Sequence, residues 1–334
     1  MHKAFLLATK TDLCKVMSHL DVLALLLAAA GHDAGHLGRS NAFEIASESP
    51  LALLYNNASP LENLHAATLL RIATRHGLFA SCAATPLPSP LLPSIPTPSL
   101  HSYTPALDPC TPAPPARTPP TALAPGSLSR KERASCRQLI INLVVSTDMA
   151  HHNALHDSLR ALPPPCATEA ADALAARRTC LLKCALHAAD LHVPTLPWAS
   201  SVGWVRALGN EFKSMVEQET ALQLPRSAFL LAADLTEQAR IETGFVSRFV
   251  APFFASMRKQ LPQLACCEEM ISSNLELWAE VADGTQAGPL DAAATPDEGG
   301  ADCHAALARQ QECVRRWHQL PTLLKPDELA LAPN

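Results

Sequence analysis

Apolar residues recur at helical spacing through residues 3–30. The stripe consists of Phe5, Leu6, Leu13, Val16, Met17, Leu20, Leu23, Leu26 and Leu27. A stripe of this width predicts amphipathic helices packed on a core. We expect two helices with a break near residues 18–21, where Asp21 can cap the second. The unbroken apolar run from Val22 to Ala30 is too short to span a bilayer and indicates a buried helix.

Helical patterns also occur further along the chain. Ser59 followed by Pro60 is typical of a helix start, with serine as the cap and proline in the first turn. Residues 169–190 predict one helix, because apolar residues and His187 recur there at helical intervals. The dense apolar run over residues 139–145 fits either a buried strand or a buried helix. Residues 303–320 predict a polar helix after a loose segment.

One stripe lies on a single predicted helix in the second half of the chain. Trp204, Leu208 and Phe212 are spaced by four residues. Such a stripe is usually part of a core, and we expect Trp204 and Phe212 to be buried there.

Prolines concentrate between residues 84 and 126. Such a stretch cannot form helices or sheet ladders, so we expect a disordered or polyproline II insertion. It divides the chain into residues 1–82, the insertion 83–128, residues 129–283, and a loose tail 284–334 with a helix. A role for the insertion as a proline-motif ligand of partner domains is an alternative to a simple linker.

Composition narrows the fold class and the partners. Hydrophobic residues make up 48% of the chain and aromatic residues only 4%, which favours an Ala/Leu-rich helical core. A formal charge of −5 without a basic block argues against nucleic acid as a partner. The eleven cysteines show no regular spacing and no signal peptide is evident, so we expect reduced thiols and a cytoplasmic location without a membrane span.

The candidate chemistry begins where the apolar run ends. His32 and His36 are four residues apart and share a face as long as the helix continues, with Asp33 beside them. Nitrogen and carboxylate donors together suit Zn²⁺, Mn²⁺ or Mg²⁺. The alternative is a capping aspartate with two ordinary histidines.

Asp190 is the second candidate. It ends the helix predicted over residues 169–190, where the helix dipole and burial would both penalise an unpaired carboxylate. A cation opposite Asp190 would remove this penalty, whereas an exposed aspartate before a proline turn needs no cation.

Five ordered blocks resemble one family. They are His32-Asp33-x-x-His36-x-Gly38-x-x-Asn41-x-Phe43; Leu53 to Asn57 with Ser59 to His65; Thr147 to His152; Ala185 to Asp190 with Pro194, Pro197 and Trp198; and Gly244 to Val246 with Phe249, Val250 and Pro252. Together they resemble the class I 3′,5′-cyclic nucleotide phosphodiesterase catalytic domain over roughly residues 4–82 and 130–280. The resemblance implies a compact, all-α, multi-helix metallophosphohydrolase fold and makes residues 139–145 a buried helix.

The resemblance also implies roles for individual residues. His32, Asp33 and Asp190 would ligate two divalent ions, Zn²⁺ and Mg²⁺ or Mn²⁺, with Asp33 as the bridge. A set of three residues would hold water and phosphate around the ions: His36, Glu62 and Thr147. A second set would enclose the purine: Leu208, Phe245 and Glu242. The implied function is hydrolysis of cAMP or cGMP to the 5′-monophosphate in signal transduction.

Departures from the family pattern point to impaired activity. The family's His-Asn-x-x-His segment, with the proton donor, would precede Met1, so the catalytic acid is not identified and His36 and His65 are only candidate helpers. Leu64 replaces the first of two consecutive histidines. Asn57 and Val193 are further departures.

Glu242 stands where the family has glutamine, and an ionised glutamate offers only acceptors. We therefore expect weak nucleotide affinity that leans towards adenine. The alternatives are a catalytically inactive module that binds a nucleotide or a partner, and another His-Asp metallophosphohydrolase.

Overall fold

The computed structural model describes residues 1–79, 128–166, 169–284 and 301–323. Every regular element in these ranges is helical, so the all-α prediction is confirmed. The expected proline-rich insertion, residues 83–128, lies almost wholly outside the described residues, as does much of the predicted loose segment before the last helix.

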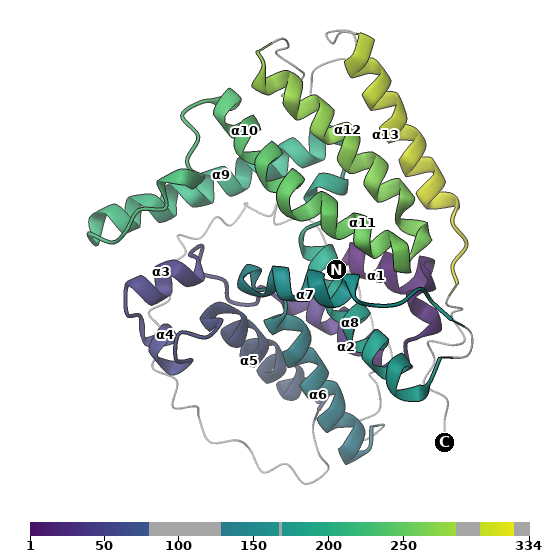
Figure 1. The fold of residues 1–334 in the computed structure, drawn as a ribbon. Helices are drawn as coiled ribbons and strands as arrows, with labels where there is room; N and C mark the ends of the chain where they lie inside the picture. Colours follow the sequence, from purple (N-terminus) through teal and green to yellow (C-terminus); the bar gives the residue numbers. More distant parts are fainter. Residues whose placement is uncertain (80–127, 167–168, 285–300, 324–334) are drawn as a thin grey trace, which may run out of the picture. The chain divides into compact units, whose positions relative to one another are not determined.

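Thirteen α-helices occur in the described ranges (Figure 1). They are α1 (His2–Lys10), α2 (His19–Gly31), α3 (Asn41–Ala46), α4 (Pro50–Leu54), α5 (Pro60–Arg75), α6 (Arg130–Val145), α7 (His152–Arg160), α8 (Ala171–Asp190), α9 (Trp198–Ala221), α10 (Leu235–Phe245), α11 (Ala251–Gln260), α12 (Ala265–Ala282) and α13 (Ala301–Gln319). Short 3₁₀ turns are Asp12–Lys15, Met149–His151, Val193–Thr195, Ala228–Leu230 and Pro262–Leu264, and Val246–Val250 is a π-helical turn.

The chain forms two compact units. The larger unit comprises Met1–Leu70 and Ser135–Asn334, and the smaller comprises Arg71–Ala134. In the smaller unit, α6 begins with a reciprocal cap: Ser129 N–H donates to Glu132 over 2.7 Å, and Glu132 N–H donates to Ser129 Oγ over 3.2 Å. The sites discussed below lie within the larger unit.

The predicted break between the first two helices is present, but its cap differs from the prediction. Ser18 caps α2 and accepts from Asp21 N–H, while the Asp21 carboxylate accepts from Ser18 N–H over 2.7 Å. This pairing is a capping box, in which Asp21 is the third helical residue rather than the cap. The run from Val22 to Ala30 lies in α2, and Ala24, Leu25 and Ala28 are fully buried.

The predicted burial of Trp204 is wrong. Trp204 is 58% exposed and Leu208 47% exposed, whereas Phe212 is half-buried. The buried face of α9 carries Trp198, Val202 and Val205 instead, which pack with Trp278 of α12. Positions 198, 202 and 205 share a helix face that residues 204 and 208 do not, so the register of α9 excludes Trp204 from the core.

The predicted C-terminal helix is confirmed as α13, which runs beside α12 in the larger unit (Figure 1). Gln310 of α13 donates to Asn274 of α12 over 2.8 Å and accepts from Trp198 N–H over 2.9 Å. Beyond α13, Leu323 N–H donates to the Thr9 carbonyl of α1 over 2.7 Å, and Lys10 Nζ reaches the Leu320 carbonyl over 2.7 Å. These bonds attach α13 to α12 and to the start of α9, and they attach the segment after α13 to α1.

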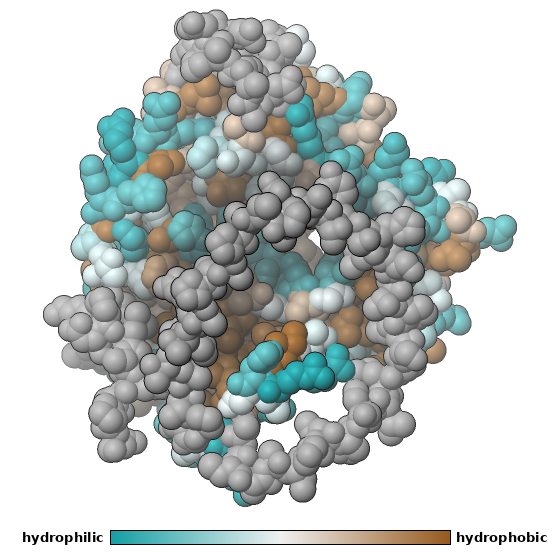
Figure 2. Space-filling model, turned by 180° about the vertical axis from the view of Figure 1, so that it is seen from behind, coloured by the Kyte–Doolittle hydropathy of each residue, from teal (hydrophilic) through white to brown (hydrophobic). Residues whose placement is uncertain are grey.

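None of the described helices combines the length and the apolar character that a membrane crossing requires. On the face drawn in Figure 2, hydrophobic and hydrophilic residues are interspersed over the described surface.

Candidate metal centre

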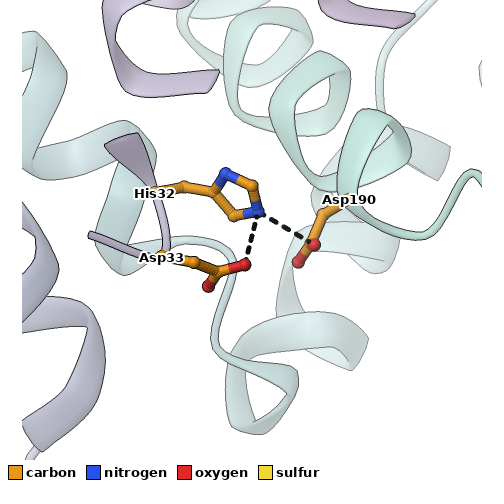
Figure 3. Close-up of side chains that lie close together, drawn as sticks. All are labelled: His32, Asp33 and Asp190. Atoms are coloured by element: carbon orange, nitrogen blue, oxygen red, sulfur yellow. Dashed lines mark hydrogen bonds and ion pairs between the residues drawn. The ribbon is translucent and has the colours of Figure 1, made fainter. Parts of the chain in front are cut away.

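Three side chains converge where two distant helices end. His32 and Asp33 directly follow α2, and Asp190 is the last residue of α8. His32 Nε2 lies 3.0 Å from Asp33 Oδ2 and 3.2 Å from Asp190 Oδ1 (Figure 3). The structure therefore brings together the three residues that the sequence proposed as metal ligands.

The donor set fits a divalent ion. One ligand atom from each of the three residues lies within 4.8 Å of the other two, and among the described residues this is the single such group of three or more. Ligands about 2.0–2.1 Å from an ion, at tetrahedral or octahedral angles, are separated by about 2.8–3.4 Å. The two distances from His32 Nε2 fall in that range. The side chains remain accessible, with 21% of His32, 61% of Asp33 and 34% of Asp190 exposed.

The contact of His32 Nδ1 also suits a metal ligand. His32 Nδ1 lies 3.2 Å from the Ala29 carbonyl, which can only accept a hydrogen bond. A proton on Nδ1 satisfies this contact and leaves the Nε2 lone pair directed at the two carboxylates. Metal-bound histidines are commonly held through the other ring nitrogen in this way.

Close helix packing positions this end of α2. A Cβ on Gly31 would lie 2.7 Å from Leu69 Cδ1 and 3.2 Å from Leu69 Cβ, so α2 and α5 approach each other too closely for a side chain here. The turn that follows uses Gly35 at φ +84° and Gly38 at φ +67°, a region in which glycine carries no Cβ penalty.

Without a metal, His32 is strongly basic. Burial opposes its charge, but hydrogen bonds with Asp190 and Asp33 outweigh burial and raise the pKa of His32 to about 10. Burial also opposes the charge of Asp33, and the hydrogen bond from His32 nevertheless holds the pKa of Asp33 below its usual value. Without a metal, the positive charge of protonated His32 thus balances the two carboxylates, as a bound cation would.

His65 and His36 lie beside this group. His65 is 2% exposed, neither of its ring nitrogens has a hydrogen-bond partner among the described residues, and its Nδ1 lies 3.8 Å from Asp33 Oδ1. Burial lowers the pKa of His65 to about 4, so its ring is neutral near pH 7. The His36 ring packs 5.6 Å from that of His65, and His36 Nδ1 lies 4.0 Å from Glu211 of α9.

Glu62 and Thr147 are held by other parts of the larger unit. Glu62 accepts from Asn41 Nδ2 over 2.8 Å. Burial, assisted by the charges of Asp148 and Asp33, raises the pKa of Glu62 even though the Asn41 bond lowers it. Thr147 is buried and donates to the Val144 carbonyl over 2.8 Å, so its hydroxyl retains accepting capacity.

α5 begins at Pro60, directly after Ser59, as the sequence predicts, but the Ser59 hydroxyl makes a tertiary contact. Ser59 Oγ donates to Asp148 Oδ2 over 2.8 Å, and the side chain that accepts from the α5 backbone, at Leu61 N–H, is Asn41. The sequence interpretation gave Asn41 no role, although this residue belongs to the first of the five blocks.

Near the predicted purine residues, α9 and α10 pack closely. A Cβ on Gly209, next to Leu208, would lie 3.3 Å from Gln238, which is one turn before Glu242. Phe245 is half-buried with its ring 5.6 Å from that of Phe249. Burial raises the pKa of Glu242 to about 7, so the premise of a fully ionised, acceptor-only carboxylate does not hold near neutral pH.

A second histidine group was not predicted from the sequence. His152 Nδ1 lies 2.9 Å from His187 Nε2, and both rings pack against Phe253. Both residues belong to the blocks quoted above, but nothing in their spacing showed that they meet. Burial lowers the pKa of His187 to about 4 and also lowers the pKa of His152, so this pair is uncharged near neutral pH.

Comparison with known proteins identifies the family of the chain. A model of the 3′,5′-cyclic nucleotide phosphodiesterase family matches residues 1–85 and 124–271. The chain is 27% identical over 252 residues to the mouse dual specificity calcium/calmodulin-dependent 3′,5′-cyclic nucleotide phosphodiesterase 1B, covering 74% of this chain and 36% of the relative. It is 26% identical over 247 residues to the mouse high affinity cGMP-specific 3′,5′-cyclic phosphodiesterase 9A, covering 73% of this chain and 37% of the relative.

A solved structure shows the same fold. It is the phosphodiesterase domain of the RhoPDE fusion protein from the choanoflagellate Salpingoeca rosetta, with a TM-score of 0.66 and 28% identity over 85% of this chain and 75% of that one. The chain spans little more than a third of the length of the two curated relatives. With the family match covering well over half of its residues, the chain belongs to the 3′,5′-cyclic nucleotide phosphodiesterase family.

Proposed function

We propose that this chain carries out metal-dependent hydrolysis of a 3′,5′-cyclic nucleotide to the 5′-monophosphate. The observation that carries the proposal is the convergence of His32, Asp33 and Asp190 at the ends of α2 and α8. Divalent ions there, Zn²⁺ with Mg²⁺ or Mn²⁺, would neutralise the phosphate charge and make water nucleophilic.

The two oxygens of Asp33 support a bridging role. Asp33 Oδ2 faces His32, whereas Oδ1 lies 3.8 Å from His65 Nδ1. One oxygen can thus serve the ion shared with His32 and Asp190, and the other is available to a second ion. His36, Glu62 and Thr147 would then orient water around the pair.

The purine would be enclosed by Leu208, Phe245 and Glu242. The exposure of Leu208 and the half-buried position of Phe245 leave apolar surface for a base, in the region where α9 approaches α10. At its raised pKa, the protonated form of Glu242 can donate a hydrogen bond as glutamine does, and this weakens the expected preference for adenine.

Of the two candidate helper histidines, only His36 suits proton donation to the leaving oxygen. His65 is neutral near pH 7 because burial lowers its pKa to about 4. His36 is 33% exposed at the side chain and can meet a substrate. His65 would instead orient Asp33.

Metal content followed by turnover tests the proposal. The purified chain should retain divalent metal by elemental analysis and should hydrolyse cAMP or cGMP with added Mg²⁺ or Mn²⁺. Asp190→Asn should abolish binding of the ion held by His32, Asp33 and Asp190, which we call the tight ion. Turnover should fall by at least about 100-fold, because one of the three protein ligands is lost. Asp157→Asn, which changes a carboxylate 75% exposed at the side chain, is the matched control and should behave as the wild type.

The alternative function is a binding module without turnover. It is favoured if the wild type retains metal and binds nucleotide but hydrolyses neither substrate. A chain that retains no metal, binds neither nucleotide and is unaffected by Asp190→Asn would contradict both functions.

A further inference from the structure

We propose that Asn41 is a positioning residue whose side-chain amide holds the Glu62 carboxylate in place for the water shell of the second divalent ion. This inference rests on the proposed function, because it assigns a role within the same site. Asn41 is the first residue of α3 and lies on a different helix from Glu62, which belongs to the first turn of α5.

Both ends of the Asn41 amide are engaged. Nδ2 donates to Glu62 Oε2 over 2.8 Å, and Oδ1 accepts from Leu61 N–H over 3.0 Å. The orientation of the amide follows from its partners, because a carboxylate only accepts and a backbone N–H only donates. One planar group therefore fixes the start of α5 and the direction of the Glu62 side chain together.

The chemistry of Glu62 explains why a neutral donor is suitable. Burial and the nearby charges of Asp148 and Asp33 disfavour its ionised form, and the bond from Asn41 offsets part of this effect. An arginine or lysine in the same place would neutralise the carboxylate. An amide stabilises the ionised form and leaves its charge available to a cation and its water.

A second contact holds the same helix start from the other side. Ser59 adopts φ +44°, an uncommon conformation for serine, and donates to Asp148, the residue after Thr147. His151 Nε2 lies 3.3 Å from the same hydroxyl. The first turn of α5 is thus tied to α3 by Asn41 and to the turn of Thr147 by Ser59, and only the Asn41 tie reaches the Glu62 carboxylate.

Manganese binding provides a test that does not depend on turnover. Mn²⁺ titration of the full chain, followed by electron paramagnetic resonance, should show a weaker site beside the tight ion in the wild type. Asn41→Ala should weaken that site about 10- to 100-fold, the usual effect of removing a group that orients a ligand, and should leave the tight ion in place. The KM for nucleotide should change little, and kcat should fall at a fixed Mn²⁺ concentration.

A double-mutant cycle separates positioning from simple helix capping. In a Glu62→Gln background, Asn41→Ala should have no further effect on the weaker site, because its action passes through the lost carboxylate. Asn63→Ala is the matched control: the Asn63 amide lies on the same helix start but donates to the carbonyls of Ala58 and Ser59 over 3.0 Å. It should leave Mn²⁺ affinity unchanged.

Each outcome decides a different claim. Additive effects in the cycle, wild-type Mn²⁺ affinity in Asn41→Ala, or an equal loss in Asn63→Ala would overturn the role of Asn41 and leave the proposed function intact. A wild type without any bound metal would overturn the proposed function itself. If Asn41→Ala does not fold, Asn41→Asp replaces it, since the carboxylate still accepts from Leu61 N–H but cannot donate to Glu62.

Discussion

His32, His65 and Glu242 show how differently one fold treats three titratable side chains. Two carboxylates raise the pKa of His32 to about 10, and burial, assisted by the charges of neighbouring histidines, lowers that of His65 to about 4. Burial without a charge partner raises the pKa of Glu242 to about 7. Spacing along the sequence carries no information on these environments, so the residue types of the site could be predicted but their protonation could not.

Glu242 leads to a prediction about pH. Its protonated form can donate to a purine and its ionised form cannot, so nucleotide affinity should fall about tenfold between pH 6 and pH 8 as the carboxyl ionises around pH 7. Glu242→Gln should bind equally well at both values. Equilibrium binding of cAMP and cGMP without added metal measures this, and a wild-type affinity that does not change with pH would contradict it.

The same shift affects folding stability. The pKa of Glu242 is higher in the folded chain than the usual 4.5, so its ionisation favours the unfolded state. Stability should be lost as pH rises from about 4.5 through 7, and Glu242→Gln should reduce that loss in thermal unfolding.

At the scale of elements, the site depends on where helices end. Residues of the metal group follow α2 directly or terminate α8, and the end of α2 is fixed by the contact between Gly31 and Leu69. The presence of the helices could be predicted from hydrophobic periodicity and turn residues. The contacts of the capping residues could not: Ser59 is a residue type typical of a cap, but its hydroxyl donates to Asp148, which is 89 residues away in the sequence. Such a choice depends on tertiary contacts that local sequence does not contain.

Gly31→Ala should disturb this helix end. The added methyl would meet Leu69 at 2.7 Å, so we expect a loss of about 1–3 kcal/mol in the free energy of unfolding, together with weaker retention of the tight metal ion. Chemical denaturation and elemental analysis measure the two effects.

Gly203→Ala in α9 is the matched control. A Cβ there meets nothing within 4 Å, so the substitution should stabilise the helix by about 0.5–1 kcal/mol. Equal stability changes in the two variants would show that the close contact between Gly31 and Leu69 does not determine the effect of Gly31→Ala.

At the scale of the whole molecule, the metal group joins residues that are 158 positions apart. Their meeting could be predicted only from the resemblance, because no local pattern links the end of α2 to the end of α8. The wrong prediction at α9, by contrast, came from a local pattern. The sequence assigned the stripe with Trp204 to the core, whereas the adjacent face of the helix, with Trp198, Val202 and Val205, packs there. Two apolar faces on one helix cannot be ranked without knowing what covers each.

The expected proline-rich insertion, residues 83–128, gives a prediction at this scale. Replacing residues 84–126 by a Gly/Ser linker of about a quarter of that length shortens the loop by two halvings, which should raise stability by only about 1.2 kcal/mol. Metal retention and nucleotide affinity should be unchanged. A loss of bound metal, or a stability loss of several kcal/mol in denaturant titration, would show that the segment contributes to the fold.

The bonds that join α1 to the segment after α13 bear on how the chain matures. The Thr9 carbonyl accepts a hydrogen bond from Leu323 N–H, and the Lys10 ammonium donates to the Leu320 carbonyl, so the end of α1 makes contacts with residues that are translated more than 300 positions later. During synthesis the end of α1 stays hydrated. A nascent chain arrested before residue 320 should therefore leave this end accessible to protease, and a chain extended until residue 323 has left the ribosome should protect it.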